Sequence, residues 1–250
     1  MRLKSVAVNL VIDIGNTQAK LVAFNGTEPV DEVRTSSATL EGLSDFLRKH
    51  PFRQGILGTV VDITPQAEKE LERIPFPMLR LDWQTPIPIR NNYATPQKLG
   101  ADRLAAAVGA YSQRPGYDTL IIDAGTCITY DFIDAQGNYR GGNIAPGLHM
   151  RLKALHAYTA KLPLVEAEGD VPDIGYDTET AIRSGVIEGM RHEIEGYIRH
   201  FKEKYPKLLI FLTGGDYINF DSTIKSIIFV DNFIVPRGLN CILAFNNDKL

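Results

Sequence analysis

The sequence has few cysteines, little net charge and no long apolar run, and each shortage argues against a class of protein. Its two cysteines, Cys127 and Cys241, lie far apart without paired spacing, which argues against a disulfide framework or a zinc site. A formal net charge of −3 and no basic cluster argue against nucleic-acid binding. No segment reaches the ~18 apolar residues of a membrane span, and the start does not read as a secretory signal. We therefore expect a cytoplasmic enzyme or binding protein without nucleic-acid or membrane partners.

The P-loop motif of many nucleotide-binding proteins is also absent, so a kinase of that class is disfavoured. Instead, two segments of the chain share one layout. In residues 8–26 an apolar run enters Asp-Ile-Gly-Asn-Thr, and a second run then ends at Asn-Gly. In residues 118–138 an apolar run enters Asp-Ala-Gly-Thr, and a second run ends at Asp-Ala-Gln-Gly-Asn. Each layout predicts strand, tight turn, strand and turn, with a third extended segment at 29–34 or 139–144.

Strands and helices alternate through the rest of the chain, which predicts an α/β fold with sheets covered on their faces. We expect two similar halves with mixed sheets flanked by helices and a cleft between them, namely residues 1–115 and 116–250. The first half carries one phosphate turn and a substrate segment, and the second carries the other turn, dimer-forming helices and an adenosine segment. The expected helices are 40–50, 65–73, one opening at Gly100, 148–157, 179–205 and 239–245; the expected further strands are 55–60, 78–81, 208–212 and 227–230.

The two turns have the chemistry of a phosphate site. A glycine lets the chain bend closely around an anion, and backbone amides attract phosphate oxygens. A carboxylate at the end of the strand, Asp13 in the first turn, suits the magnesium that accompanies ATP, usually through water. A single turn of this kind is equally an ordinary hairpin. The matching Asp123–Thr126 turn in the other half is what favours a nucleotide site gripped from both sides.

Two more segments add candidate roles. Gly214 and Gly215 follow an apolar strand, where a glycine pair lets an adenosine lie flat against the backbone. Asp102 and Arg103 open an Ala-rich helix after Leu99-Gly100-Ala101. Asp102 is either a helix cap or the acceptor of a substrate hydroxyl proton, since phosphoryl transfer needs positioning more than a strong base. Arg103 suits a substrate carboxylate through a forked pair of hydrogen bonds.

Taken together, the motifs closely resemble those of type III pantothenate kinases, which are of the actin-like, ribonuclease-H-like class. The resemblance follows the family's order over nearly the whole chain. It departs at Tyr176-Asp177, where the family more usually has Arg-Asn, and at Cys127-Ile128. The motifs are DIGNT (13–17), LGADR (99–103), DAGTCITYD (123–131), GGNIAPG (141–147), TAKLP (159–163), DTETAIRSGV (177–186) and LTGGD (212–216).

The resemblance implies phosphorylation of pantothenate at its primary hydroxyl, the first step toward coenzyme A. It implies ATP with Mg²⁺, a monovalent cation such as K⁺ or NH₄⁺, and a homodimer. Thr178 would contact substrate across or near the dimer interface, and Asp123 would ligate the monovalent cation. The implied ATP and magnesium contacts are Asp13, Gly15, Asn16, Thr17, Lys20, Gly125, Thr126, Gly214 and Gly215. The implied pantothenate contacts are Tyr93, Gly100, Ala101, Asp102 as proton acceptor, and Arg103.

Two other functions remain open at the level of sequence. One is a non-catalytic regulator that binds nucleotide or a protein partner on the same scaffold. The other is a kinase or phosphatase for a different small acid or for polyphosphate. The intact Asp102-Arg103 pair argues against the first, and the whole LGADR segment argues against the second.

Overall fold

The computed structural model describes residues 8–215 and 228–247, so Asp216 and Ile227 of the predicted segments lie outside the described residues. Two compact units divide the chain. Unit 1 comprises 1–116, 133–140 and 233–250, and unit 2 comprises 117–132 and 141–232. The first division falls beside the expected boundary at residues 115 and 116, while the C-terminal helix groups with unit 1.

Unit 1 contains a five-stranded mixed sheet of order β3-β2-β1-β4-β5. The first three strands form the predicted antiparallel meander, and β4 and β5 continue the sheet in parallel. The strands are β1 (Val8–Ile14), β2 (Gln18–Asn25), β3 (Glu28–Ser36), β4 (Phe52–Thr59) and β5 (Met78–Arg80), and the helices of this unit are α1 (Leu43–Lys49), α2 (Pro65–Leu71), α3 (Ala101–Gln113) and α7 (Ile234–Phe245).

Alternation along β1 decides what each face of this sheet meets. Leu10, Ile12 and Ile14 are fully buried in a core that includes residues of α1 and α2. The residues between them point to the opposite face, where Asn9 donates a 2.8 Å hydrogen bond to Asn240 of α7. Asp13 therefore lies on the face of the sheet that α7 covers. Helix α3 packs against α7 on this same side.

Helices α3 and α7 lie with their backbones in direct contact. A β-carbon on Gly238 would lie 1.8 Å from the carbonyl oxygen of Ala105, and one on Gly109 would lie 2.1 Å from that of Ile234. Small residues thus allow the close approach, which fixes the start of α3 and with it the predicted substrate segment.

Unit 2 repeats the strand order of unit 1. Its strands follow β9-β8-β7-β10-β11, with β10 and β11 parallel to β7. The elements are β7 (Thr119–Ala124), β8 (Cys127–Ile133), β9 (Asn138–Pro146), β10 (Leu209–Gly214), β11 (Ile228–Val230), α4 (Leu148–Ala157) and α5 (Thr178–Lys204). Helix α5 covers the sheet, since Met190, Ile194 and Ile198 are buried in one core with Tyr130 and Ile122. The predicted pair of similar mixed sheets flanked by helices is confirmed.

Two predictions about elements were incomplete. The closing helix α7 begins at Ile234 rather than Leu239, because a proline in the first turn of a helix, here Pro236, loses no helical hydrogen bond. The loop expected from residue 85 to 96 contains the short strand β6 (Arg90–Asn91), which pairs with the start of β9, and a 3₁₀ turn, η1 (Pro96–Lys98), follows. Both depend on contacts far away in sequence.

Candidate active site

The first turn ends a strand whose partner carries a lysine. In the antiparallel register Asp13 lies opposite Lys20, so the two side chains share one face of the hairpin. Asn16 and Thr17 at the tip are exposed. The turn is held from behind by Ser37, whose hydroxyl donates a 2.8 Å hydrogen bond to the carbonyl oxygen of Gly15.

The carboxyl group of Asp13 is electrostatically unusual. Its pKa is raised to about 6, chiefly by loss of hydration and in smaller part by the negative charge of Asp102, against the lowering effect of Lys20. Asp102, at the start of α3 in the same unit, is thus close enough for its charge to act on Asp13. A carboxylate with a raised pKa gains from a cation placed beside it. Asp13 therefore fits the role of a magnesium ligand, because Mg²⁺ with a nucleotide takes one or two carboxylates besides water and phosphate oxygens.

Asp102 lies in the first turn of α3, as predicted. Its Oδ1 accepts a 2.7 Å hydrogen bond from the amide of Arg103. A β-carbon on Gly100 would lie 2.5 Å from this same oxygen, so Gly100 leaves the space that the carboxylate occupies. The helix-cap interpretation was wrong, since Gly100 is the N-cap of α3 and no side chain caps this end; Asp102 lies inside the first turn and binds the amide of the next residue.

Arg103 is almost buried, and an aromatic ring covers its charge. Its exposed fraction is 7%, and the guanidinium carbon lies 5.7 Å from the centre of the Tyr93 ring. Tyr93 in turn lies 6.2 Å, centre to centre, from the buried ring of Tyr139. The structure therefore brings Tyr93 and Arg103, both predicted to bind substrate, together in unit 1.

A pocket of about 660 Å³ opens beside this segment in unit 1. Gly100 and Ala101 form part of its wall, and the ends of the parallel strands β4 and β5 lead into it. Trp83 lines the pocket and is 57% exposed, so its ring faces the pocket rather than packing in the core. Ligand sites in α/β sheets commonly lie at the carboxyl ends of parallel strands.

The second turn is enclosed by its neighbours in unit 2. Asp123 and Ala124 end β7, and β10 runs beside them with Thr213 opposite Asp123 and Gly214 opposite Ala124. A β-carbon on Gly214 would lie 2.1 Å from the carbonyl oxygen of Ala124, and the φ of Gly214 is 108°. The predicted adenosine segment and the predicted phosphate turn therefore touch, and Gly215 is exposed just beyond them.

One residue that the motif analysis left without a role braces this turn. A β-carbon on Gly147 would lie 2.1 Å from the carbonyl oxygen of Gly125, and the amide of Gly147 donates a 3.1 Å hydrogen bond to the carbonyl oxygen of Thr126. Gly147 is the last residue of the GGNIAPG motif, but no local sequence pattern indicates which backbone segment it approaches.

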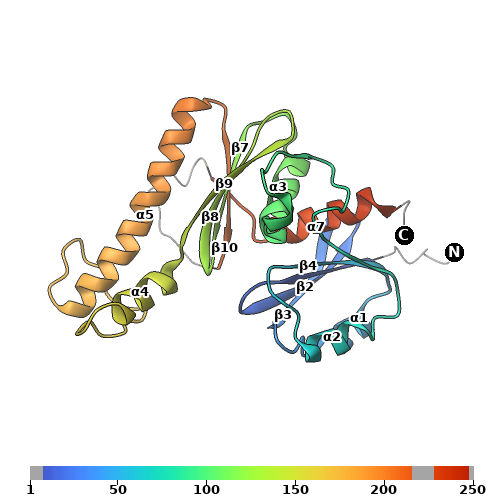
Figure 1. Cartoon of the computed structure of the whole chain (residues 1–250), viewed down its shortest axis with the longest axis horizontal. Helices are drawn as coiled ribbons and strands as arrows, with labels where there is room; N and C mark the ends of the chain where they lie inside the picture. The colour runs from blue at the N-terminus through green and yellow to red at the C-terminus, as the bar shows by residue number, and fades with distance from the viewer. Residues whose placement is uncertain (1–7, 216–227, 248–250) are drawn as a thin grey trace. The chain divides into compact units, whose positions relative to one another are not determined.

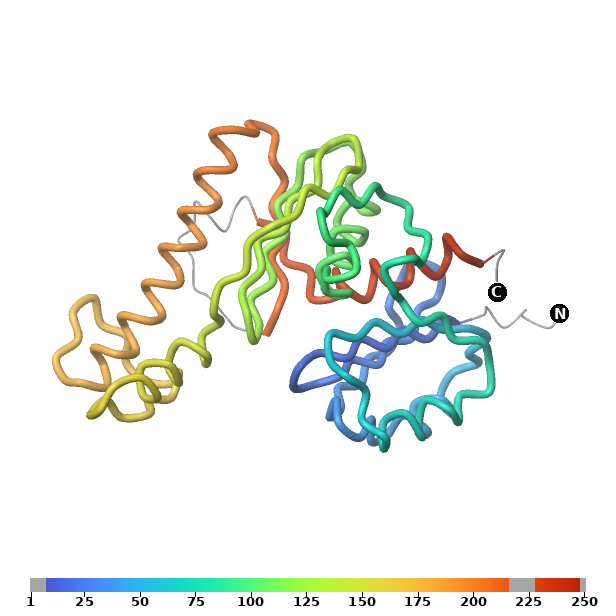
Figure 2. Tube along the Cα trace, in the orientation of Figure 1, coloured from blue at the N-terminus to red at the C-terminus, as the bar shows by residue number. Residues whose placement is uncertain are grey.

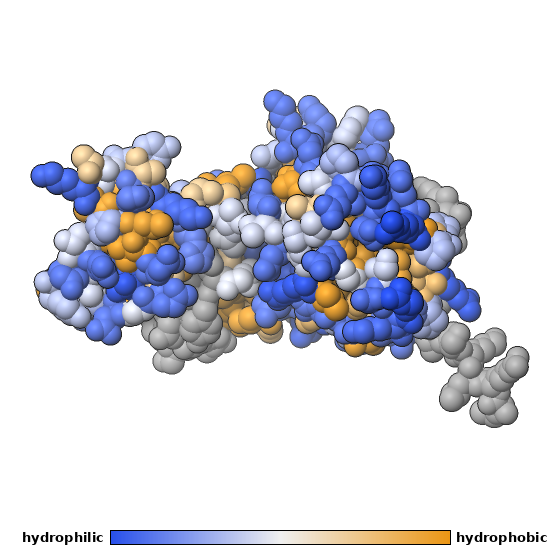
Figure 3. Space-filling view, turned by 90° about the horizontal axis from the view of Figure 1, so that it is seen from below, coloured by the Kyte–Doolittle hydropathy of each residue, from blue (hydrophilic) through white to orange (hydrophobic). Residues whose placement is uncertain are grey.

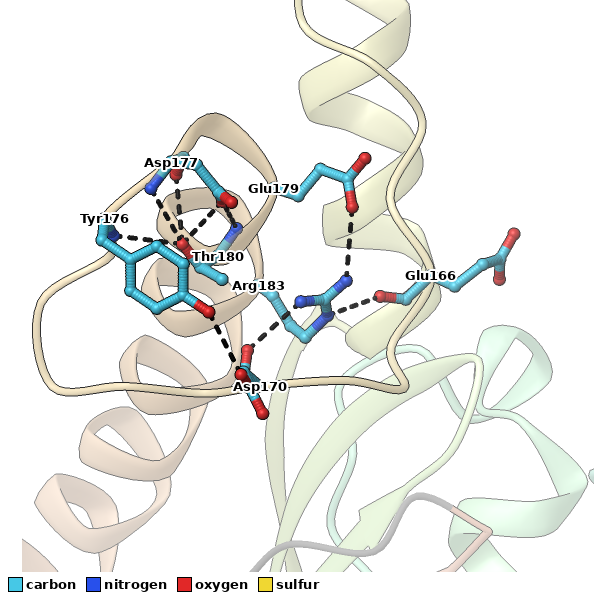
Figure 4. A network of polar contacts seen from close by, with 7 residues as sticks. All are labelled: Glu166, Asp170, Tyr176, Asp177, Glu179, Thr180 and Arg183. Carbon is cyan, nitrogen blue, oxygen red and sulfur yellow. Dashed lines mark hydrogen bonds and ion pairs between the residues drawn. The ribbon is translucent and has the colours of Figure 1, made fainter.

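Thr178 is the first residue of α5, and the departure at Tyr176-Asp177 still builds a well-capped helix start. Asp177 forms a capping box with Thr180, with a 2.8 Å hydrogen bond from the Thr180 amide. The Tyr176 hydroxyl donates a 3.1 Å hydrogen bond to Asp170. Figure 4 shows Arg183 reaching the carbonyl oxygens of Glu166 and Asp170, which ties the preceding loop to the helix.

Thr178 also lines an apolar groove of about 1070 Å³ between α4 and α5. Tyr158, which borders it, is 89% exposed. Figure 3 shows apolar side chains gathered at the left, where unit 2 carries α4 and the start of α5. We call this surface the α4–α5 groove; its lining residues are Pro146, Met150, Arg151, Ala154, Leu155, Tyr158, Thr159, Leu162, Thr178, Ala181, Ile182, Gly185 and Val186.

Sequence comparison identifies the family. Residues 9–200 match the family model described as type III pantothenate kinase. A type III pantothenate kinase of Bacteroides fragilis is 54% identical over 97% of this chain and 100% of its own length. One of Porphyromonas gingivalis is 40% identical over 96% of this chain and 100% of its own length. In the described residues, no helix is long and apolar enough to span a membrane.

Solved structures agree on the fold. A putative Baf family transcriptional activator from Campylobacter jejuni has a TM-score of 0.61 at 21% identity, covering 96% of this chain and 99% of its own. The ethanolamine utilization protein EutJ from Carboxydothermus hydrogenoformans has a TM-score of 0.53 at 14% identity, covering 94% and 89%. At these identities the likeness concerns the fold alone, and it supports the predicted actin-like class.

Proposed function

The chain belongs to the type III pantothenate kinase family and phosphorylates pantothenate in coenzyme A biosynthesis, and from this premise we propose which of its residues carry the reaction. The observation that carries the proposal is the start of α3, where Asp102 lies in the first helical turn next to the buried Arg103, over which the Tyr93 ring lies. The charge of Asp102 also raises the pKa of Asp13 in the same unit, which supports a shared site.

Asp102 orients the primary hydroxyl of pantothenate and accepts its proton as the oxygen attacks the terminal phosphorus of ATP. A strong base is unnecessary, since the transition state of phosphoryl transfer is loose and positioning dominates. Arg103 and Tyr93 hold pantothenate with Gly100 and Ala101, and Arg103 pairs with its carboxylate. The support is the buried guanidinium stacked beside Tyr93 at the start of α3.

The two turns take the phosphates of ATP, and the glycine pair takes its adenosine. Gly15, Asn16, Thr17 and Lys20 are the proposed phosphate contacts of the first turn, and Gly125 and Thr126 are those of the second. Gly214 and Gly215 receive the adenosine, which the contact between Gly214 and Ala124 supports. This assigns the first phosphate turn and substrate segment to residues 1–115, and the second turn to residues 116–250.

Asp13 holds Mg²⁺, directly or through water, and Asp123 holds a monovalent cation, K⁺ or NH₄⁺. When bound, these ions neutralise charge on the transferring phosphoryl group. The protein's own contribution is to keep a carboxylate at the end of each first strand, as the registers of β1 and β7 support.

The protein acts as a homodimer in the cytoplasm, with the α4–α5 groove as the interface between copies and Thr178 contacting pantothenate across or near it. The groove's apolar lining and the exposed Tyr158 support an interface, since monomers rarely leave large apolar surfaces uncovered.

One assay tests the catalytic assignment. ADP release from ATP should depend on pantothenate and rise with potassium. Asp102→Asn should lower kcat by roughly 10²–10⁴-fold, the usual range for a general base, while thermal stability stays near that of wild type. Asp45→Asn on the exposed face of α1 is the matched control and should keep full activity. Full turnover by the Asp102 variant would remove Asp102 from the mechanism.

Light scattering tests the dimer. Wild-type protein should have the mass of two chains, and Tyr158→Asp should shift it toward one. Val30→Asp is a control, because Val30 is an exposed apolar residue of unit 1, away from the groove. A monomeric wild-type protein would end the dimer proposal without touching the assignment of Asp102.

A further inference from the structure

The GGNIAPG motif, residues 141–147, contains no acidic, basic or nucleophilic side chain, yet its backbone is tightly packed. A β-carbon on Gly142 would lie 2.2 Å from the carbonyl oxygen of Tyr130, and one on Gly147 would lie 2.1 Å from that of Gly125. The two glycines therefore let β9 lie directly against β8 and against the second phosphate turn. Figure 2 shows β9 running on into α4 at this point.

Gly147 connects the phosphate turn to a helix. Its amide donates to the carbonyl oxygen of Thr126 at 3.1 Å, and its own carbonyl oxygen accepts from the amide of Arg151 at 3.0 Å. Gly147 is the N-cap of α4. A shift of the first turn of α4 would therefore also move Gly125 and Thr126, because Gly147 is in close backbone contact with both.

Arg151 fixes that first helical turn at two points. Its Nε donates a 2.7 Å hydrogen bond to the carbonyl oxygen of Pro146, and its Nη2 donates a 2.6 Å hydrogen bond to Oε2 of Glu193 on α5. The Arg151 side chain is only 20% exposed. A planar guanidinium holds two partners in a set geometry, which the ammonium group of lysine does not reproduce.

Glu193 completes the link to the strand that follows the turn. Its Oε1 accepts a 2.8 Å hydrogen bond from the hydroxyl of Tyr130 on β8. Burial raises the pKa of Tyr130 well above its usual value, as does its bond to Glu193, so the hydroxyl stays a donor. Tyr130 is 1% exposed and stacks on Tyr197 with ring centres 3.8 Å apart.

We propose that Arg151, Glu193 and Tyr130 are positioning residues that hold Gly147 against the Gly125–Thr126 turn and thereby set how that turn meets ATP. The proposal rests on the proposed contact between Thr126 and ATP. Groups that bind phosphate must be held to within about half an ångström, and residues behind them supply that precision. Both oxygens of Glu193 are used, one for α4 and one for β8, so the triad joins the two sides of the turn.

The first test is Arg151→Met in the full-length protein. We expect the KM for ATP to rise about tenfold with the KM for pantothenate within about twofold of wild type, since only the ATP-binding turn moves. The control is Arg191→Met. Like Arg151, Arg191 donates hydrogen bonds to glutamate side chains, here Glu188 and Glu195, but these do not link it to the turn. Equal effects of the two variants on the KM for ATP would overturn the proposal. Because Arg151 also lines the α4–α5 groove, the mass of each variant is measured.

A double-mutant cycle with Thr126→Ala separates this proposal from the one beneath it. If Thr126→Ala leaves the KM for ATP unchanged, the proposed role of the turn fails. If it raises the KM and Arg151→Met multiplies that effect independently, the turn binds ATP but the triad does not act through it. We expect the KM for ATP of the double variant to be close to that of the single variant with the larger increase. This non-additive result is the one for residues that act as a unit.

Milder variants decide the matter if Arg151→Met does not fold. Tyr130→Phe keeps the stacked ring and removes one hydrogen bond to Glu193, and it lies away from the α4–α5 groove. We expect the KM for ATP to rise about threefold, with kcat nearly unchanged. Arg151→Lys should also raise the KM for ATP, but by less than Arg151→Met does. An unchanged KM for ATP in both variants would overturn the proposal.

Discussion

The two phosphate turns have the same sequence layout but different support. In the first, Ser37 binds the carbonyl oxygen of Gly15, and the tip residues Asn16 and Thr17 are exposed. In the second, backbone glycines lie against the turn on two sides, Gly147 on Gly125 and Gly214 on Ala124. Beyond the backbone hydrogen bonds at Ile14 and Gly15, the first turn is supported by a side-chain hydroxyl, whereas the second is supported by tight backbone packing.

The difference separates two uses of glycine. A β-carbon on Gly125 would meet nothing closer than 3.8 Å, and its φ is not positive, so the fold does not require glycine there. Gly147 and Gly214 have no such room. A glycine that the protein itself does not need is the one best explained by a ligand that approaches the backbone.

The largest effect is expected from Gly214→Ala. The new β-carbon would lie 2.1 Å from the carbonyl oxygen of Ala124, at a φ of 108° that alanine rarely adopts. We expect a loss of about 3 kcal/mol or more in the free energy of unfolding, measured by urea denaturation. Gly215→Ala, where nothing lies within 4 Å, is the control and should unfold like wild type. Equal stability of the two variants would contradict the packing of the second turn.

Asp13→Asn should stabilise the protein at pH 8 in the absence of nucleotide and magnesium. The pKa of this carboxyl is raised from 3.8 to about 6, so the folded state binds its proton more tightly than the unfolded state. The contribution of this carboxyl to stability is therefore full below about pH 4 and is lost as the pH rises through about 6. Asparagine carries no charge, so the gain at pH 8 should approach about 3 kcal/mol and should vanish near pH 4. Thermal unfolding across this range measures it, and a destabilised variant at pH 8 would contradict the assignment.

Gly125→Ala should affect binding and leave folding intact. We expect the KM for ATP to rise about tenfold, equivalent to about 1.4 kcal/mol, because a methyl group would stand between the backbone and the phosphates. The melting temperature should stay within about a degree of wild type. A variant with an unchanged KM for ATP would show that the glycine serves no ligand.

Ser37→Ala should have the smallest effect. It removes the hydroxyl that supports Gly15, at a cost of about 1 kcal/mol in the free energy of unfolding. Ser44→Ala, whose hydroxyl makes only a long 3.4 Å contact with Glu70, is the control. A loss as large as that of Gly214→Ala would mean that the two turns are supported equally well.

Many of the structural elements of this protein can be predicted from its sequence. The paired strand–turn–strand layouts, the bounds of α4 and the start of α5 near Asp177 all follow from local patterns, which depend on a few neighbouring residues. The exposure of Trp83 and the early start of α7 did not follow from them. Each depends on what lies nearby in space, which apolar spacing along the chain does not record.

By itself the sequence determined the two similar α/β halves, the family and the residue types at both turns, because hydrophobic alternation and turn chemistry act over short distances. The tertiary structure alone decided that the charge of Asp102 acts on Asp13, that Gly147 packs against Gly125, and that Glu193 joins Arg151 to Tyr130. Those contacts join residues distant in the chain, and their energies depend on burial and on separations of a few ångströms that exist only once the chain has folded.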